Sequence, residues 1–128
     1  MSGNRFVLDT NAVIQLLKGN EQILQAIQGA DFLAISIITQ LEFCAFPQIS
    51  DHDQALFRRF LERIDVVDLS AQNTALIEQI TALRTQVKLK LPDAIIAATA
   101  LNSQATLLTA DAKLLKAMNT YGQGFAPV

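Results

Sequence analysis

Residues 5–17 read RFVLDTNAVIQLL, and a change of pattern inside this stretch decides the fold class. Its first four residues form a short apolar run that ends at Asp9, which is typical of a buried strand. From Ala12 to Leu17 the apolar residues instead recur at helical spacing, so we expect a helix that opens at Asp9. A buried strand that passes directly into a helix is the unit from which α/β domains are built.

The same alternation continues along the chain. Further strands are predicted at residues 32–35, 64–69 and 106–109, and a short apolar tail follows near Phe125. Apolar spacing and helix-start residues predict helices that begin at Asn20, residue 38, Asp51, Ser70, Pro92 and Ala110. Strands with nearly continuous apolar cores predict a mostly parallel sheet covered on both faces. The sequence has no repeat or linker, so residues 1–128 are expected to form one domain.

The composition is that of a globular protein without a disulfide framework. Hydrophobic residues make up 51% of the chain and charged residues 17%, which fits a filled interior. The single cysteine, Cys44, excludes an internal disulfide, and its apolar neighbours Phe43, Ala45 and Phe46 predict a buried thiol. No apolar run approaches the roughly 20 residues needed to span a bilayer, and no signal-peptide pattern is present. We therefore expect a soluble, cytoplasmic protein.

Four carboxylates stand at expected strand ends and helix starts: Asp9, Glu42, Asp93 and Asp111. In parallel sheets, functional groups gather beyond the carboxyl ends of the strands. Asp9 follows the first strand, Glu42 lies early in the helix after the second, and Asp111 comes two residues after Thr109. Each also has a purely structural interpretation. Asp9 and Asp111 are candidate helix caps, Asp93 suits a first helical turn, and Glu42 suits an exposed helix face.

Four carboxylates in one cleft would repel one another and raise one another's pKa values, a penalty that a divalent cation removes. Oxygen ligands select Mg²⁺, or Mn²⁺ as a substitute, over zinc. The single histidine, His52, lies between two acids and is interpreted as a surface residue. Carboxylate-held Mg²⁺ activates water and stabilises the leaving oxygen of a phosphodiester. The sequence has neither a credible nucleophilic triad nor a phosphate-binding glycine loop.

The net charge of −2 argues against a general nucleic-acid coat. Without the four acids above, however, eight acidic residues remain against ten basic ones. Six basic residues cluster between positions 58 and 90: Arg58, Arg59, Arg63, Arg84, Lys88 and Lys90. A phosphate-binding face and an ordinary solvated surface explain this cluster equally well.

Four segments together resemble the motif set of PIN-domain ribonucleases, and most closely the VapC toxins of bacterial toxin–antitoxin pairs. They are LDTNAVI at 8–14, TQLEF at 39–43, LPDAIIAA at 91–98 and LLTAD at 107–111. No single motif is sufficient, but their order and spacing cover nearly the whole chain. The resemblance implies a PIN-like three-layer α/β/α domain and Mg²⁺-dependent endonucleolytic cleavage of RNA. It also implies a homodimer and neutralisation by a cognate antitoxin.

The resemblance assigns roles to individual positions. Asp9, Glu42 and Asp93 would form the metal-coordinating, catalytic core, and Asp111 would be the fourth acid. Supporting hydrogen bonds would come from Asn11 and Thr109. If the chain cleaves RNA, the substrate phosphates are expected to meet some of the clustered basic residues Arg58, Arg59, Arg84, Lys88 and Lys90, a set chosen from the charge pattern.

One departure from the family pattern concerns the fourth acid. Many family members place a further Asp a few residues after the threonine motif, where this chain has Lys113, Leu114 and Leu115. The fourth ligand in this segment is therefore Asp111 or none.

Two other functions compete with the ribonuclease. A non-catalytic PIN-like interaction module would use its acids only to cap helices, and metal would not stabilise it. An aspartyl-phosphate phosphatase of the haloacid dehalogenase type would need a second Asp two residues after its nucleophile, where this chain has Asn11. The phosphatase is therefore the weaker alternative.

Overall fold

A five-stranded parallel sheet forms the centre of the structure, a computed structural model that describes residues 4–122 and 124–125. The strands are β1 (Arg5–Leu8), β2 (Phe32–Ser36), β3 (Asp65–Val67), β4 (Thr106–Leu108) and β5 (Gly124–Phe125). The α-helices are α1 (Thr10–Leu17), α2 (Glu21–Ile27), α3 (Ile37–Cys44), α4 (Asp51–Leu61), α5 (Thr74–Ala82), α6 (Leu91–Asn102) and α7 (Ala112–Tyr121). A π-helical turn, η1 (Leu83–Val87), extends α5.

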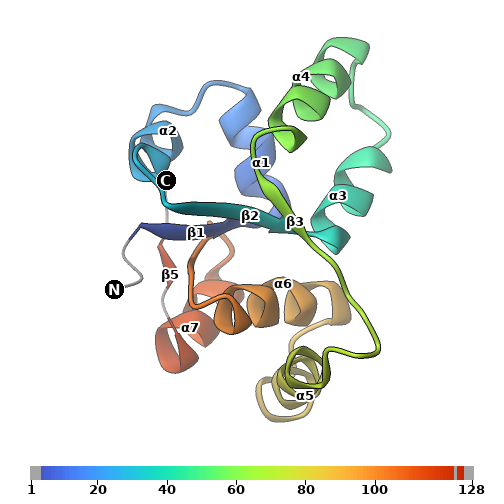
Figure 1. The fold of residues 1–128 in the computed structure, drawn as a ribbon, viewed down its shortest axis with the longest axis vertical. Coiled ribbons are helices and arrows are strands. Elements are labelled where there is room, and N and C mark those ends of the chain that lie inside the picture. Colours follow the sequence, from blue (N-terminus) through green and yellow to red (C-terminus); the bar gives the residue numbers. More distant parts are fainter. Residues whose placement is uncertain (1–3, 123, 126–128) are drawn as a thin grey trace.

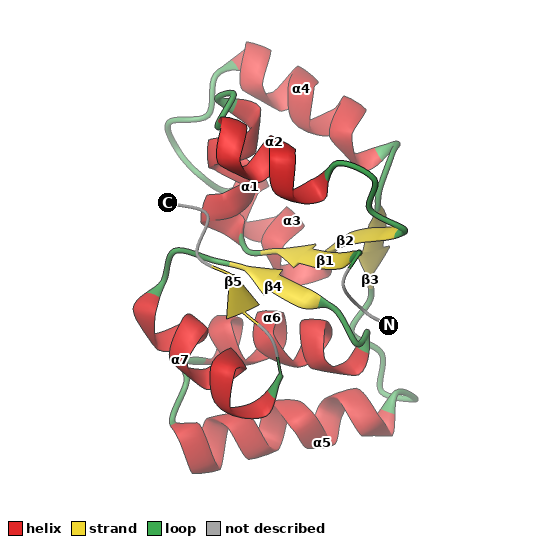
Figure 2. Cartoon of the chain, turned by 90° about the vertical axis from the view of Figure 1, so that its left-hand side faces the viewer, coloured by secondary structure: helices red, strands yellow, loops and turns green. Residues whose placement is uncertain are grey.

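Helices cover both faces of the sheet. Figure 1 shows α1 to α4 on one face and α5 to α7 on the other, and Figure 2 shows the same layers from the side. The predicted α/β class and the three-layer α/β/α architecture with a parallel sheet are confirmed.

The strand order β3-β2-β1-β4-β5 changes direction at β1. From β1 the chain adds β2 and β3 on one side, and it then crosses through α5 and α6 to place β4 on the other side. In open parallel sheets, a crevice forms at such a switch point, beyond the carboxyl ends of the strands. Here the two ends are Leu8 and Leu108, which are paired in register.

The core is divided by the sheet into two apolar clusters. Side chains alternate along a strand, so Val7 packs towards α5, α6 and α7 while Phe6 and Leu8 pack towards the opposite layer. In that second layer Phe43 and Phe57 stack with their ring centroids 4.0 Å apart, which ties α3 to α4. Both faces of the sheet are therefore buried, as the continuous apolar strands predict.

The middle of helix α6 is enclosed by the core, which explains why its apolar residues are found on all sides. It contacts three strands of the sheet and also α5 and α7, and residues 94–100 are all buried. Its first turn, which contains Pro92 and Asp93, is consequently held in a fixed place at the edge of the core. Neither α6 nor any other helix in the described part of the chain combines the length and apolarity needed to cross a membrane.

The helix-start residues predicted for α4 and α5, Asp51 and Ser70, are not the N-caps of these helices. Ser50 rather than Asp51 caps α4, because the Ser50 hydroxyl accepts a hydrogen bond from the Asp53 backbone N–H (3.0 Å). Helix α5 begins four residues after Ser70, because the side chain of Asn73 is its N-cap. In both places a neighbouring polar side chain satisfies the free backbone N–H groups of the first turn.

One further local prediction is wrong. Cys44 is exposed, not buried. It is the last residue of α3 and follows the buried Phe43, and consecutive helical residues point about 100° apart, so that Cys44 faces solvent. In the apolar tail near Phe125, the two described residues form β5 and pair with β4.

Candidate active site

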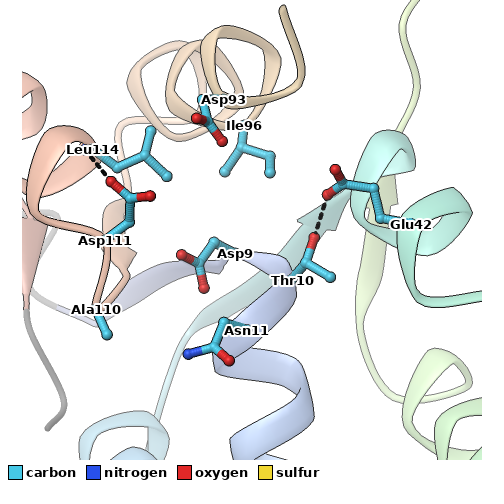
Figure 3. A pocket seen from close by; sticks show the side chains of 9 residues that line it. All are labelled: Asp9, Thr10, Asn11, Glu42, Asp93, Ile96, Ala110, Asp111 and Leu114. Carbon is cyan, nitrogen blue, oxygen red and sulfur yellow. Dashed lines mark hydrogen bonds between the residues drawn. The ribbon is translucent and has the colours of Figure 1, made fainter. Parts of the chain in front are cut away.

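A pocket of about 360 Å³ lies at the crevice beyond β1 and β4 (Figure 3). It brings together all four predicted acids from four separate elements. Asp9 and Asp111 contribute from the N-caps of α1 and α7, Glu42 from α3, and Asp93 from the first turn of α6. The complete lining is Asp9, Thr10, Asn11, Glu42, Asp93, Ile96, Ala110, Asp111 and Leu114.

Asp9 is the most deeply buried acid of the pocket, with 5% of its surface exposed. Its backbone N–H donates to the Leu108 carbonyl (3.2 Å), which holds the end of β1 against β4. Its Oδ1 accepts a hydrogen bond from the Ala12 backbone N–H (2.8 Å), so Asp9 is the N-cap of α1. The capping interpretation of Asp9 is correct, and the same carboxylate also lines the pocket (Figure 3).

Thr109 connects Asp9 to Asp111. Its fully buried side chain hydrogen-bonds the Asp9 carboxylate, and the hydroxyl is the donor because an ionised carboxylate only accepts. Thr109 Oγ1 also accepts a hydrogen bond from the Asp111 backbone N–H (3.0 Å). One hydroxyl therefore sets the relative position of the two strand ends that carry these acids.

Asp111 caps α7 at the rim of the pocket. Its Oδ1 accepts hydrogen bonds from the backbone N–H groups of Lys113 (2.9 Å) and Leu114 (3.1 Å). These two bonds use one carboxylate oxygen. The capping interpretation is correct for Asp111 as well, although the side chain also faces the other acids.

Glu42 reaches the pocket from the opposite wall. It is partly buried, and its Oε1 accepts a hydrogen bond of 2.6 Å from the Thr10 hydroxyl (Figure 3). Glu42 is therefore a held side chain and not a freely exposed helix residue.

Asp93 approaches from above the other acids in Figure 3, with its carboxylate directed from α6 towards the pocket. It is in the first turn of α6 but is not its N-cap, because that position is Lys90, whose side chain makes no capping hydrogen bond. A carboxylate in this turn gains from the helix dipole. The packed helix also fixes its place at the pocket.

Burial is the main cause that raises the pKa of Asp9. Hydrogen bonds from Thr109 and from the Ala12 backbone oppose this shift because they stabilise the ionised form. The negative charges of Asp111 and Asp93 raise the pKa further. The ionised pocket therefore has an electrostatic cost.

The pKa of Asp93 is also raised, first by burial and then by the charges of Asp111 and Glu42. Two positive charges, on Lys90 and Lys113, act in the opposite direction and lower it. The pKa of Asp93 thus depends on acids on two sides of the pocket and on two lysines.

The side chains suit a hard divalent cation in donor chemistry, but they are not gathered into a coordination group. The ionisable side chains among the described lining residues are all carboxylates, the ligands that Mg²⁺ and Mn²⁺ prefer. Within the described ranges, no three His, Cys, Asp or Glu side chains form a group that could hold a metal ion. Asp9, Glu42 and Asp111 each give an oxygen to a local hydrogen bond, and the charges repel. Local hydrogen bonds therefore fix three of the four carboxylates.

The five basic residues predicted to meet phosphates are divided between two helical layers. Two are on α4 and three are on the segment from η1 to α6: Arg58 and Arg59, and Arg84, Lys88 and Lys90. Arg59 lines a separate, mainly apolar groove of about 430 Å³ bounded by α1, α2 and α4. Of the five, Lys90 is the residue whose charge acts on Asp93.

Two predicted residues remain, Asn11 and His52. Asn11 lines the pocket and is exposed. His52 is exposed near the start of α4, as predicted.

Sequence reasoning missed Thr10 and Lys113. Thr10 lines the pocket and holds Glu42, and Lys113 is close enough to influence Asp93. The available signal was adjacency, because Thr10 follows Asp9 and Lys113 comes two residues after Asp111.

Comparison with known proteins identifies the fold family. The family model described as PIN domain matches residues 6–119, which confirms the resemblance predicted from the four motifs. No significant match was found among curated proteins.

Solved structures share the whole fold. A toxin–antitoxin complex from Klebsiella pneumoniae contains a chain 31% identical to this one, with a TM-score of 0.75 over 95% of this chain and 97% of that chain. The DNA-bound VapBC from Salmonella typhimurium matches at 22% identity and a TM-score of 0.76, over 97% of this chain and 98% of that chain. VapBC2 from Rickettsia felis, bound to a promoter DNA fragment, matches at 22% identity and 0.74, over 94% and 98%.

Proposed function

This chain belongs to the PIN-domain family, and from that premise we propose that it is a metal-dependent endoribonuclease, the toxin of a toxin–antitoxin pair. The observation that carries the enzymatic proposal is the pocket at the switch point of the sheet. Four carboxylates from four elements face one another there, with pKa values raised for Asp9 and Asp93. Carboxylates held together at an electrostatic cost are typical of functional sites.

Asp9, Glu42 and Asp93 would hold a Mg²⁺ or Mn²⁺ ion, with Asp111 as a fourth acid. A bound cation would supply Lewis-acid chemistry, activating a water and stabilising the leaving oxygen of the phosphodiester. The chain's own part is to position the donors. Asp9 is held by the α1 cap and by Thr109, Glu42 by Thr10, and Asp93 by the buried helix α6. Lys90 and Lys113 would bring positive charge to the substrate phosphates.

Cleavage of total bacterial RNA, resolved on a gel, tests this proposal. Purified protein is incubated with Mg²⁺, with Mn²⁺ and with EDTA, beside an Asp93→Asn variant purified identically to control for a contaminating nuclease. Discrete fragments that require metal and disappear in the variant are expected. Cleavage that persists in EDTA, or equally in the variant, contradicts the metal-dependent mechanism.

The toxin role is supported by the 31% identical chain in a toxin–antitoxin complex. On this basis we expect a cognate antitoxin as partner. The sequence also predicts action in the cytoplasm, and the family resemblance predicts a homodimer. Light scattering of the purified protein measures the oligomeric state. Co-expression with the product of a neighbouring gene tests for the antitoxin, which should relieve growth arrest.

A second candidate is a non-catalytic interaction module. The observation that favours it is that Asp9 and Asp111 do cap helices and that no metal-holding group is assembled within the described residues. It differs from the nuclease in the response of its stability to metal, since caps alone give no metal-dependent gain.

A further inference from the structure

Thr10 lies between two side chains of α3. Its Oγ1 is 2.6 Å from Glu42 Oε1 and 3.4 Å from Thr39 Oγ1. Thr39 and Glu42 are three residues apart on α3 and so share one face of that helix. Thr10 is the first residue of α1 and stands directly after Asp9. The contact therefore joins the walls of the pocket that carry Asp9 and Glu42.

The number of available protons decides the direction of these bonds. A threonine hydroxyl has one hydrogen to donate, and an ionised carboxylate only accepts. The short contact to a charged acceptor takes the Thr10 proton. In the longer contact, Thr39 is then the residue that donates, to a lone pair of Thr10. The three groups form a chain that runs from Thr39 through Thr10 to Glu42, and each bond polarises the next.

Glu42 needs this support more than the aspartates do. A glutamate has a longer side chain, and fixing such a chain in one place costs up to about 2 kcal/mol of rotamer entropy. Asp9 and Asp111 obtain their anchors from backbone N–H groups of their own helices. The anchor of Glu42 comes from a side chain on another helix. Thr39, with 0% exposure, is placed by packing and gives Thr10 a fixed neighbour.

We propose that Thr10, backed by Thr39, is a positioning residue that holds Glu42 in the orientation needed to bind a divalent cation. The Thr10 hydroxyl donates a hydrogen bond to Glu42 Oε1 and so holds the carboxylate at the pocket. This inference rests on the proposed metal-dependent function. It assigns Thr10 no contact with the substrate.

Mn²⁺ binding measured by calorimetry tests the role of Thr10 without depending on cleavage. Thr10→Val keeps the shape and removes the hydroxyl, and it should weaken Mn²⁺ binding about tenfold, the usual scale for losing a partner that orients a metal ligand. Thr10→Ser keeps the hydroxyl and should bind within about twofold of wild type. Thr39→Val should have a smaller effect, and that effect should vanish when Thr10 is already Val.

Thr74→Val is the matched control. Thr74 is the first residue of α5, as Thr10 is of α1, and it is exposed and outside the pocket lining. The substitution should not change Mn²⁺ affinity. In a Glu42→Gln background, Thr10→Val should cause no further loss, because the group it positions is no longer a charged ligand.

The outcomes separate this inference from the proposed function. Wild-type protein that binds Mn²⁺ and cleaves RNA, beside a Thr10→Val variant of unchanged affinity, overturns the role of Thr10 alone. Equal losses in Thr10→Ser and Thr10→Val would also overturn it, since the hydroxyl would then be irrelevant. Wild-type protein that neither binds Mn²⁺ nor cleaves RNA overturns both.

Discussion

The Thr109 hydroxyl donates a hydrogen bond to the Asp9 carboxylate across the gap between the ends of β4 and β1. The same oxygen accepts from the Asp111 backbone N–H (3.0 Å). Both ends of this bridge are polar groups at or near the buried core, which are costly to leave without a partner.

Thr109→Val should therefore lower the free energy of unfolding by about 1–3 kcal/mol, the cost of leaving buried polar groups unsatisfied. Urea denaturation without metal measures this change. Thr99→Val is a suitable control, because Thr99 is also buried but, among the described residues, its hydroxyl bonds only to the Ile95 carbonyl of its own helix (2.7 Å). A loss at Thr109 no larger than that at Thr99 would show that the bridge is unimportant for stability.

Stability without metal should depend on pH in the direction opposite to that of a salt-bridged acid. The folded-state pKa values of Asp9 and Asp93 are raised above the ordinary value of 3.8, so the folded protein binds more protons than the unfolded chain between 3.8 and the raised values. The contribution of these two acids to stability thus falls as pH rises through that window.

Asp93→Asn isolates this effect. In EDTA the variant should melt at a higher temperature than wild type at neutral pH, and the difference should disappear as pH falls below the window. Paired thermal melts across the acidic and neutral range measure the difference. A variant that is less stable than wild type at neutral pH would indicate that the Asp93 charge is favourable in the metal-free protein.

Mg²⁺ should reverse the order of these two proteins. A cation that binds only the folded state adds about 2.7 kcal/mol when its concentration is 100 times the dissociation constant, and Asp93→Asn should lose most of this gain. Thermal melts with and without Mg²⁺ test the metal site against the non-catalytic interaction module. The exposed helix-start acid Asp51 provides the control, since Asp51→Asn should retain the full gain. No gain in wild type would favour the module.

The strand ends explain why much of the pocket was predictable from the sequence. Asp9 and Asp111 follow β1 and β4 within a few residues, and parallel strands bring such positions to one edge. Asp93 was harder to place, because no strand precedes it directly. A helix that leads into a parallel strand runs back along the sheet, so its start lies at the same edge as the strand ends. That rule would have placed Asp93.

Particular contacts in the pocket depend on tertiary packing and have no local sequence signal. The hydrogen bond between Thr10 and Glu42 depends on how α1 packs against α3. The spacing of residues within each motif carries no information about how the two helices pack. The prediction that Cys44 is buried failed for a similar reason. The apolar sequence around it indicates the average burial of the segment but not the direction of one side chain.

The separation of the basic residues into two layers predicts that they contribute unequally to RNA binding. Lys90 and Lys113 are close enough to Asp93 to lower its pKa, whereas Arg59 lines the groove between α1, α2 and α4. Lys90→Gln and Lys113→Gln should each weaken binding of a labelled single-stranded RNA, measured by fluorescence anisotropy in Ca²⁺ to avoid cleavage. Each should reduce the slope of log affinity against log salt by about 0.7, the value for one single-strand phosphate contact.

Lys116→Gln is the control for general loss of charge, because Lys116 is exposed on the same helix as Lys113 but is not among the charges that shift the pKa of Asp93. It and Arg59→Gln should leave the salt slope close to that of wild type. Equal salt slopes for all four variants would mean that RNA affinity depends only on the net charge of the protein. A larger effect at Arg59 than at Lys90 would place the RNA path along α4, away from the acids.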